Sequence, residues 1–155
     1  VWYGYTSPAL VAEPVRAAMA AAPENLCFAG FVSQAELRDA YCGADAFAFC
    51  SHEETEGIVV LEALACGVPV LVRDIPVYEG WLEAGKNVYK ARRAEDLATL
   101  LAAMLAKELP DLTAAGRRVA QDRSLARMGQ ALCGIYEKEA RHHARAEQPG
   151  TVRTA

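Results

Sequence analysis

The fold is decided by the stretch AFAFCSHEETEGIVVLEALACGVPVLV, residues 46–72. The aromatic run at 46–50 is typical of a strand, and so is the β-branched run at 69–72. Between the two runs, residues 58–66 predict a short helix that ends at Gly67. A strand, a helix and a second strand in this order predict one parallel βαβ unit.

The same alternation continues on both sides of this stretch. Strands are also expected at residues 1–5, 26–28 and 87–91. Helices are expected at residues 9–22, 33–43, around 97–105, 110–122 and 124–144. The second of these helices begins with Ser33 and Glu36, which have the spacing of a capping box. The sequence therefore predicts an α/β fold, a Rossmann-like parallel sheet of about five strands that is flanked by helices.

Two of the expected helices carry an apolar stripe. The helix around 97–105 has apolar residues at positions i, i+3, i+4, i+7 and i+8, which predicts a face that packs in the core: Leu97, Leu100, Leu101, Met104 and Leu105. The last helix carries a similar set along one face: Leu125, Met128, Leu132 and Ile135.

The composition indicates a folded protein that does not bind nucleic acid. Its 155 residues are 53% hydrophobic and 23% charged, which suffices for one core and excludes disorder. The 16 basic and 20 acidic side chains give a net charge of −4, so the broad basic surface that nucleic acid requires is absent. We expect one domain at residues 1–147 and a flexible tail at 148–155, where Pro, Gly and Thr occur without an apolar pattern.

Several features predict a cytoplasmic protein. Five cysteines stand among apolar neighbours without a C-x-x-C pair, so we interpret them as buried thiols: Cys27, Cys42, Cys50, Cys66 and Cys133. We expect no signal peptide, and the longest uncharged apolar run, 63–72, is about half of a membrane span. Residues 116–155 hold 8 basic and 4 acidic side chains. This basic end is either a solvated helix or a stretch that docks peripherally on the inner face of the membrane.

Carboxylates gather where a ligand is expected. Open parallel sheets bind ligands outside the carboxyl ends of their strands, which directs attention to residues 51–57. Glu53 and Glu56 are explained as acids that the dipole of the following helix favours. Glu62 needs another explanation, because it lies inside an otherwise apolar helix and a buried carboxylate requires a partner. It either meets a buried arginine or amide group, or its end opens into a ligand cleft.

The chemistry of this segment suits a sugar ligand. Glu54 and Glu62 are acceptor groups, eight residues apart, for the hydroxyl donors of a sugar. Gly57 lets the backbone approach a ligand, and the N–H groups that follow it can hold a phosphate. The acidic loop would repel a diphosphate, so a Lys or Arg must come from elsewhere. His52 alone and the pair His142 and His143 lack the spacing of a metal site, and we expect none.

Four segments in this order carry a family resemblance. They are FAGFV at 28–32, YCGADAF at 41–47, the E-x7-E motif from Glu54 to Glu62, and EALACGVPV at 62–70. They resemble the C-terminal half of family 4 retaining glycosyltransferases of the GT-B fold. More narrowly, EETEGIVVLE at 53–62 and RDIPVY at 73–78 resemble bacterial 1,2-diacylglycerol 3-glucosyltransferases, which glucosylate a membrane lipid from UDP-glucose.

The resemblance implies a role for each matching position. Glu54 corresponds to the catalytic glutamate near the donor sugar hydroxyls and the reacting centre, and Glu62 to the glutamate that binds the ribose. The remaining donor-binding positions are the backbone of Gly57, Ile58 and Val59 beside the sugar and diphosphate, and Phe31 and Val32 along the uracil. The resemblance implies no cofactor and no metal, with UDP-glucose as a substrate.

The resemblance also implies what the whole enzyme does. We expect the donor-binding half of a retaining glycosyltransferase that moves glucose from UDP-glucose to a diacylglycerol-type lipid or a glycan acceptor. Family members are more than twice as long, so we interpret the chain as an inactive fragment whose missing N-terminal domain binds the acceptor. A missing upstream unit would supply a central strand and the basic residues that grip the diphosphate, which predicts a gap in the sheet or a shifted pairing. The alternatives are a GT-B transferase or epimerase with another sugar acceptor, and a non-catalytic interaction module of the same fold.

Overall fold

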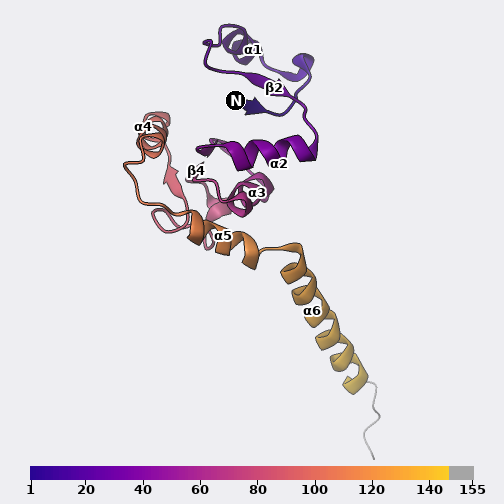
Figure 1. Cartoon of the computed structure of the whole chain (residues 1–155). Coiled ribbons are helices and arrows are strands. Elements are labelled where there is room, and N and C mark those ends of the chain that lie inside the picture. Colours follow the sequence, from indigo (N-terminus) through magenta and orange to yellow (C-terminus); the bar gives the residue numbers. More distant parts are fainter. Residues whose placement is uncertain (147–155) are drawn as a thin grey trace, which may run out of the picture. The chain divides into compact units, whose positions relative to one another are not determined.

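The computed structural model describes residues 1–146 as two compact units, Val1–Asp45 and a second unit that starts at Ala46 (Figure 1). The tail predicted at 148–155 lies outside the described residues. All strand pairs in both units are parallel, as predicted. Within residues 1–146 the five predicted strands form a two-stranded and a three-stranded sheet instead of one.

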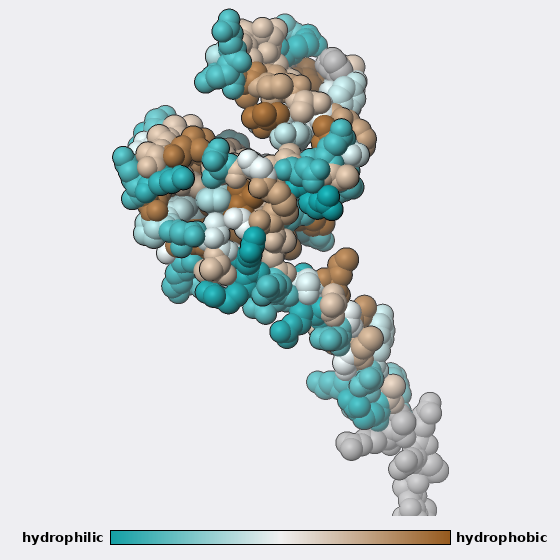
Figure 2. Space-filling view, in the orientation of Figure 1, coloured by the Kyte–Doolittle hydropathy of each residue, from teal (hydrophilic) through white to brown (hydrophobic). Residues whose placement is uncertain are grey.

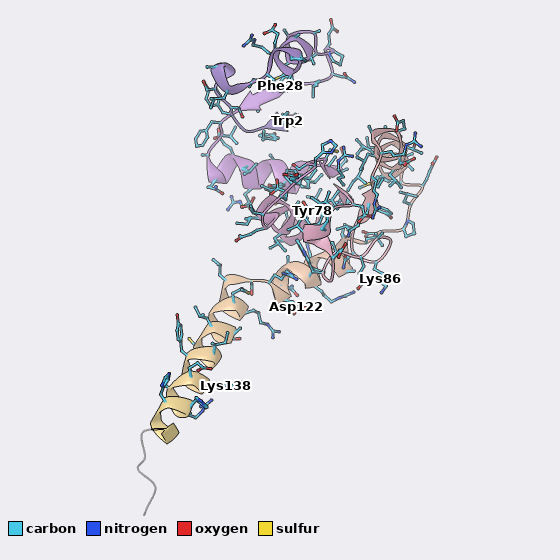
Figure 3. All side chains as sticks on the ribbon, turned by 180° about the vertical axis from the view of Figure 1, so that it is seen from behind. Trp2, Phe28, Tyr78, Lys86, Asp122 and Lys138 are labelled. Atoms are coloured by element: carbon cyan, nitrogen blue, oxygen red, sulfur yellow. The ribbon has the colours of Figure 1, made fainter. Side chains whose placement is uncertain are left out.

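The first unit is a small parallel βαβ arrangement followed by a helix. Its elements are β1 (Trp2–Tyr3), η1 (Pro8–Leu10), α1 (Glu13–Ala20), β2 (Phe28–Gly30) and α2 (Gln34–Gly43). The rings of Trp2 and Phe28 lie on the two neighbouring strands, tilted by 46° with centroids 6.4 Å apart (Figure 3). The predicted capping box is confirmed: the Ser33 hydroxyl accepts from the Glu36 N–H at 3.3 Å, and the Glu36 carboxylate accepts from the Ser33 N–H at 2.8 Å.

The second unit contains the stretch that decides the fold. Its elements are β3 (Phe47–Phe49), α3 (Ile58–Cys66), β4 (Val70–Arg73), η2 (Pro76–Tyr78), β5 (Tyr89–Ala91), α4 (Ala94–Leu105), α5 (Thr113–Asp122) and α6 (Leu125–Ala146). The sheet order is β3-β4-β5, with Phe47 opposite Val70 and Leu71 opposite Tyr89. This order confirms the βαβ unit predicted from residues 46–72.

Two glycines limit helix α3 to the predicted residues. Gly57 and Gly67 stand at its two ends with φ of 72° and 76°, a left-handed conformation that favours glycine. A Cβ at Gly67 would lie 2.5 Å from Nε of Arg117, so the Arg117 side chain would have to move to admit one. The same guanidinium donates to the Cys66 carbonyl at 3.2 Å and so satisfies a carbonyl at the C-terminal end of α3.

The central strand β4 is buried on both of its faces. Val70, Leu71 and Val72 are all at most 2% exposed, and their side chains alternate between the faces of the sheet. Leu71 packs with Leu97 and Met104 of α4, which confirms the predicted core stripe of that helix. Leu105 is the exception in the stripe, since 54% of it is exposed.

Helix α6 presents its apolar residues to solvent. Leu125, Met128, Leu132 and Ile135 are between 51% and 92% exposed. Figure 2 shows apolar and hydrophilic side chains alternating along this helix. In the part of the chain from Val1 to Ala146, no helix combines the length and the apolar character that crossing a bilayer requires.

The prediction of buried cysteines is wrong. Four of the five thiols are exposed, and only Cys66 is half-buried. Cys27 and Cys50 directly flank strands of three residues, so their apolar neighbours in sequence do not enclose them. Cys133 lies on α6, whose side chains from Leu125 to His143 are all exposed.

Candidate functional site

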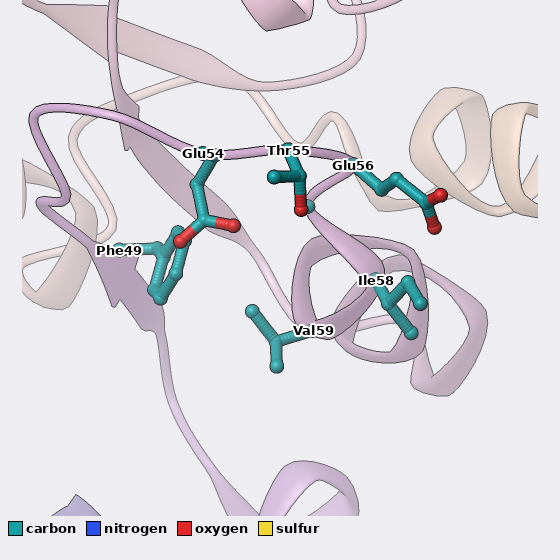
Figure 4. A pocket seen from close by; sticks show the side chains of 7 residues that line it. Phe49, Glu54, Thr55, Glu56, Ile58 and Val59 are labelled. Carbon is teal, nitrogen blue, oxygen red and sulfur yellow. The ribbon is translucent and has the colours of Figure 1, made fainter.

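A pocket of about 200 Å³ opens where β3 ends and α3 begins (Figure 4). Its lining comes from the last residue of β3, from the loop, and from the first two residues of α3: Phe49, Glu54, Thr55, Glu56, Gly57, Ile58 and Val59. Glu53, Glu54 and Thr55 line a second hollow of about 320 Å³. The predicted location, outside the carboxyl end of a strand, agrees with this pocket.

Glu54 and Glu56 differ in orientation although both belong to the loop. Figure 4 shows the Glu54 carboxylate on the same side of the loop as the Phe49 ring, whereas the Glu56 carboxylate is directed away from that ring. Glu54 is half-buried and Glu56 is exposed. Of the two, Glu54 is therefore the carboxylate that a ligand in the pocket would meet.

The N-terminal end of α3 supplies the second half of the pocket. The first N–H groups of a helix have no partner within it, and the helix dipole makes this end favourable for an anion. Ile58 and Val59 carry such N–H groups, and both residues line the pocket. Gly57, which precedes them, is buried and takes the left-handed conformation that turns the chain into the helix.

The pocket therefore combines four of the seven predicted site residues: Glu54, Gly57, Ile58 and Val59. Glu62 lies further along α3 and is not among the residues that line it. Its side chain is half-buried. Phe31 and Val32 belong to the first unit, directly after β2, and 85% of Phe31 is exposed. The roles of Glu62, Phe31 and Val32 stay predictions.

Basic side chains near the strand ends are engaged with backbone and with Asp74. Arg73 donates from Nε to the Cys50 carbonyl at 3.0 Å and from a second nitrogen to the Arg92 carbonyl. This one side chain thus connects the segment that follows β3 with the segment that follows β5. Asp74 pairs with Arg92 at 3.0 Å and with Lys90 at 3.6 Å. Within residues 1–146 no basic side chain lines the pocket, so the acidic loop is not neutralised there.

Sequence reasoning missed Tyr78, which lies directly against Gly57. A Cβ added to Gly57 would be 2.8 Å from the Tyr78 ring and 3.4 Å from its hydroxyl oxygen. Tyr78 is 1% exposed, and burial together with the charge of Glu54 raises the pKa of its phenol to about 12. Its segment RDIPVY took part in the family resemblance, but nothing in the sequence connects position 78 with position 57.

The sequence matches the family described as "Glycosyl transferases group 1" over residues 15–122. The chain is 36% identical to the processive diacylglycerol alpha-glucosyltransferase of Acholeplasma laidlawii, a match that covers 89% of this chain and 42% of that protein. It is 30% identical to the alpha-galactosylglucosyldiacylglycerol synthase of Streptococcus pneumoniae, over 76% of this chain and 32% of that one. A D-inositol 3-phosphate glycosyltransferase of Geodermatophilus obscurus is 34% identical, over 75% of this chain and 27% of that protein. The chain thus spans well under half the length of these relatives.

Solved structures share the fold. The crystal structure of Anabaena HepE in complex with UDP-glucose superposes with a TM-score of 0.72 at 19% identity, over 88% of this chain and 40% of that one. The crystal structure of the GtfA/B complex gives a TM-score of 0.66 at 19% identity, over 88% of this chain and 28% of that one. These likenesses confirm the predicted Rossmann-like α/β fold.

Proposed function

Because the chain belongs to the glycosyl transferases group 1 family, we propose that it is the donor-binding half of an enzyme that transfers glucose from UDP-glucose to a diacylglycerol-type lipid. The family membership confirms the resemblance to GT-B glycosyltransferases predicted from the sequence. The observation that carries the proposal is the pocket in which the Glu54 carboxylate meets the N-terminal end of α3. A sugar nucleotide needs these two features together, an acceptor for hydroxyl groups and a site for an anion.

In this proposal each part of the pocket holds one part of the donor. The N–H groups of Ile58 and Val59 bind the diphosphate, since the helix dipole favours negative charge at this end of α3. Glu54 accepts hydrogen bonds from the glucose hydroxyls and holds the sugar while its bond to UDP breaks and the bond to the acceptor oxygen forms. The acceptor hydroxyl passes its proton to the phosphate oxygen of the departing UDP in the same transfer, which proceeds with retention of configuration.

Three further residues complete the proposed donor site. Glu62 binds the ribose hydroxyls, and Phe31 and Val32 line the uracil. Basic residues that neutralise the diphosphate come from a part of the enzyme other than the lining of this pocket, because that lining is acidic.

The remaining partners also belong to the proposal. The relatives that name a diacylglycerol acceptor are more than twice as long as the region that they share with this chain. We infer that the rest of the enzyme binds the acceptor and that the enzyme docks on the cytoplasmic face of the membrane. The relative named for D-inositol 3-phosphate makes a soluble acceptor the second candidate.

The test uses the full-length protein that contains this chain. It is incubated with UDP-glucose and vesicles that contain diacylglycerol, and the extracted lipids are analysed by mass spectrometry. A hexosyl-diacylglycerol product is expected from the wild type and from Glu56→Gln, whose carboxylate points away from Phe49. Glu54→Gln should lose most of the product. UDP release without a glycolipid would retain the transferase and reject the lipid acceptor.

A further inference from the structure

The hydroxyl of Tyr78 is buried and has no hydrogen-bond partner among the described residues. The residue is 1% exposed, and its oxygen is out of contact with solvent. Buried hydroxyl groups are nearly always paired, because an unpaired one loses the hydrogen bonds that it made with water. An unpaired buried donor next to a ligand pocket therefore calls for a functional explanation.

The Tyr78 ring is packed against neighbouring side chains, which favours the buried position of its hydroxyl. Its ring packs edge-on against Trp81 at 5.6 Å, and the Arg123 guanidinium covers Trp81 at 4.5 Å. Lys90 also lies near the ring, with Nζ 6.0 Å from the centre of the Tyr78 ring. The backbone is held as well, since the Leu82 N–H donates to the Tyr78 carbonyl at 3.1 Å.

The Tyr78 hydroxyl lies next to Gly57, at the end of the loop that carries Glu54. Its oxygen is 3.4 Å from the position that a Cβ of Gly57 would occupy, and Gly57 is three residues after Glu54. The charge of Glu54 reaches the phenol strongly enough to contribute to its raised pKa. A carboxylate accepts hydrogen bonds and donates none, and a protonated phenol can donate one.

We propose that Tyr78 is a positioning residue of this site, whose hydroxyl donates a hydrogen bond to the Glu54 carboxylate when a nucleotide sugar occupies the pocket. The inference rests on the proposed function, because Glu54 is the residue placed there against the donor sugar. The hydrogen bond fixes one carboxylate oxygen and leaves the other for a sugar hydroxyl. Tyr78 acts through Glu54 and touches no reacting atom.

The first test is the stability of the ligand-free protein. Tyr78→Phe removes only the unpaired hydroxyl, so the Tm of the full-length protein without UDP-glucose should stay the same or rise. Tyr89→Phe is the matched control, because the Tyr89 hydroxyl donates to the Pro110 carbonyl and its loss should lower the Tm. A fall in Tm for Tyr78→Phe as large as that for Tyr89→Phe would show that the Tyr78 hydroxyl is already bonded, and would overturn the inference.

The second test is a double-mutant cycle on UDP-glucose affinity, measured by calorimetry. Tyr78→Phe should weaken UDP-glucose binding roughly tenfold, as expected for loss of a hydrogen bond to a charged group. In a Glu54→Gln background the same change should have little further effect, because the two residues act together. Tyr89→Phe should leave the affinity unchanged. Independent, multiplying effects of Tyr78→Phe and Glu54→Gln would reject the positioning role.

These outcomes separate the inference from the function on which it rests. If Glu54→Gln weakens UDP-glucose binding but its effect is independent of Tyr78→Phe, the inference is rejected and the proposed function is kept. A wild-type protein that does not bind UDP-glucose rejects both.

Discussion

Replacing Gly57 by alanine should lower the stability of the protein through backbone strain and through a clash with Tyr78. The same substitution at a second glycine separates the two costs. The φ of 72° costs an L residue about 1–2 kcal/mol, since the left-handed region crowds Cβ against the backbone. The new Cβ would also lie 2.8 Å from a ring carbon of Tyr78, a side chain that is 1% exposed and held by Trp81. Forcing an atom into a packed site costs a further ~1–3 kcal/mol. Gly57→Ala should therefore destabilise the protein by roughly 2–5 kcal/mol.

Gly85→Ala is the control for the backbone term alone. Gly85 has a φ of 73°, and a Cβ there would meet nothing within 4 Å. The contact with Tyr78 is the extra cost of Gly57→Ala over Gly85→Ala, ~1–3 kcal/mol. The calorimetric Tm of Gly57→Ala in the full-length protein should therefore lie roughly 2–12 °C below that of Gly85→Ala. Adding Gly57→Ala to a Tyr78→Leu variant removes the contact with the ring and leaves only the backbone cost. In that background, Gly57→Ala should therefore cost no more stability than Gly85→Ala costs in the wild type. Equal Tm values for Gly57→Ala and Gly85→Ala would refute the close contact between Gly57 and Tyr78.

Three further predictions concern the core, a helix end and a titration. Gly116→Ala should lower stability by about 1–3 kcal/mol in thermal unfolding, because its Cβ would lie 2.6 Å from the buried Leu64; an unchanged Tm would contradict this packing. Ser33→Ala should cost about 1 kcal/mol and speed hydrogen exchange of the Glu36 amide, since the hydroxyl that accepts from the Glu36 N–H is lost; unchanged exchange would count against the capping box. The pKa of Tyr78, raised from 10.0 to about 12, means that the folded state holds this proton to higher pH than the unfolded state does, so stability should fall by up to about 3 kcal/mol as pH rises from 10 to 12. The ultraviolet absorbance of tyrosinate should show a late titration that Tyr78→Phe removes, and its persistence in that variant would refute the assignment.

The elements that the sequence predicts best are those whose ends carry their own chemical signal. The sequence predicts helix α3 with the bounds that the structure has, because its apolar run ends at Gly67, a residue that tolerates the left-handed conformation that closes the helix. The start of α2 was equally predictable, since Ser33 and Glu36 satisfy each other's backbone within four residues.

The residues that sequence analysis missed depend on contacts between distant positions. Tyr78 is 21 positions after Gly57, and the two meet only after β4 has paired beside β3. No local pattern around Tyr78 distinguishes it from an ordinary core tyrosine. For Glu62 the local pattern was present but ambiguous. The apolar residues around it predict a buried helix, and they do not determine how exposed the carboxylate is. The structure shows Glu62 half-buried.

The apolar pattern also overestimated the burial of the cysteines beside short strands. The cysteines beside β2 and β3 are exposed, because a strand of three residues covers little of the residue that follows or precedes it. The stripe on α4 packs on the sheet, whereas the similar stripe on α6 faces solvent. A periodic pattern therefore predicts which residues share a face of a helix, and it does not determine what covers that face.

The claim that Glu54 meets the sugar of the donor is tested most directly by comparing the affinities of the full-length protein for UDP and for UDP-glucose. Our account predicts that Glu54→Gln weakens UDP-glucose binding about tenfold, through loss of charged hydrogen bonds to the sugar. The affinity for UDP should stay equal or increase, because the variant removes a negative charge from the pocket that holds the diphosphate. Glu56→Gln should leave the ratio of the two affinities near the wild-type value. An equal loss of affinity for UDP and UDP-glucose in Glu54→Gln, or no loss for either, would contradict the account.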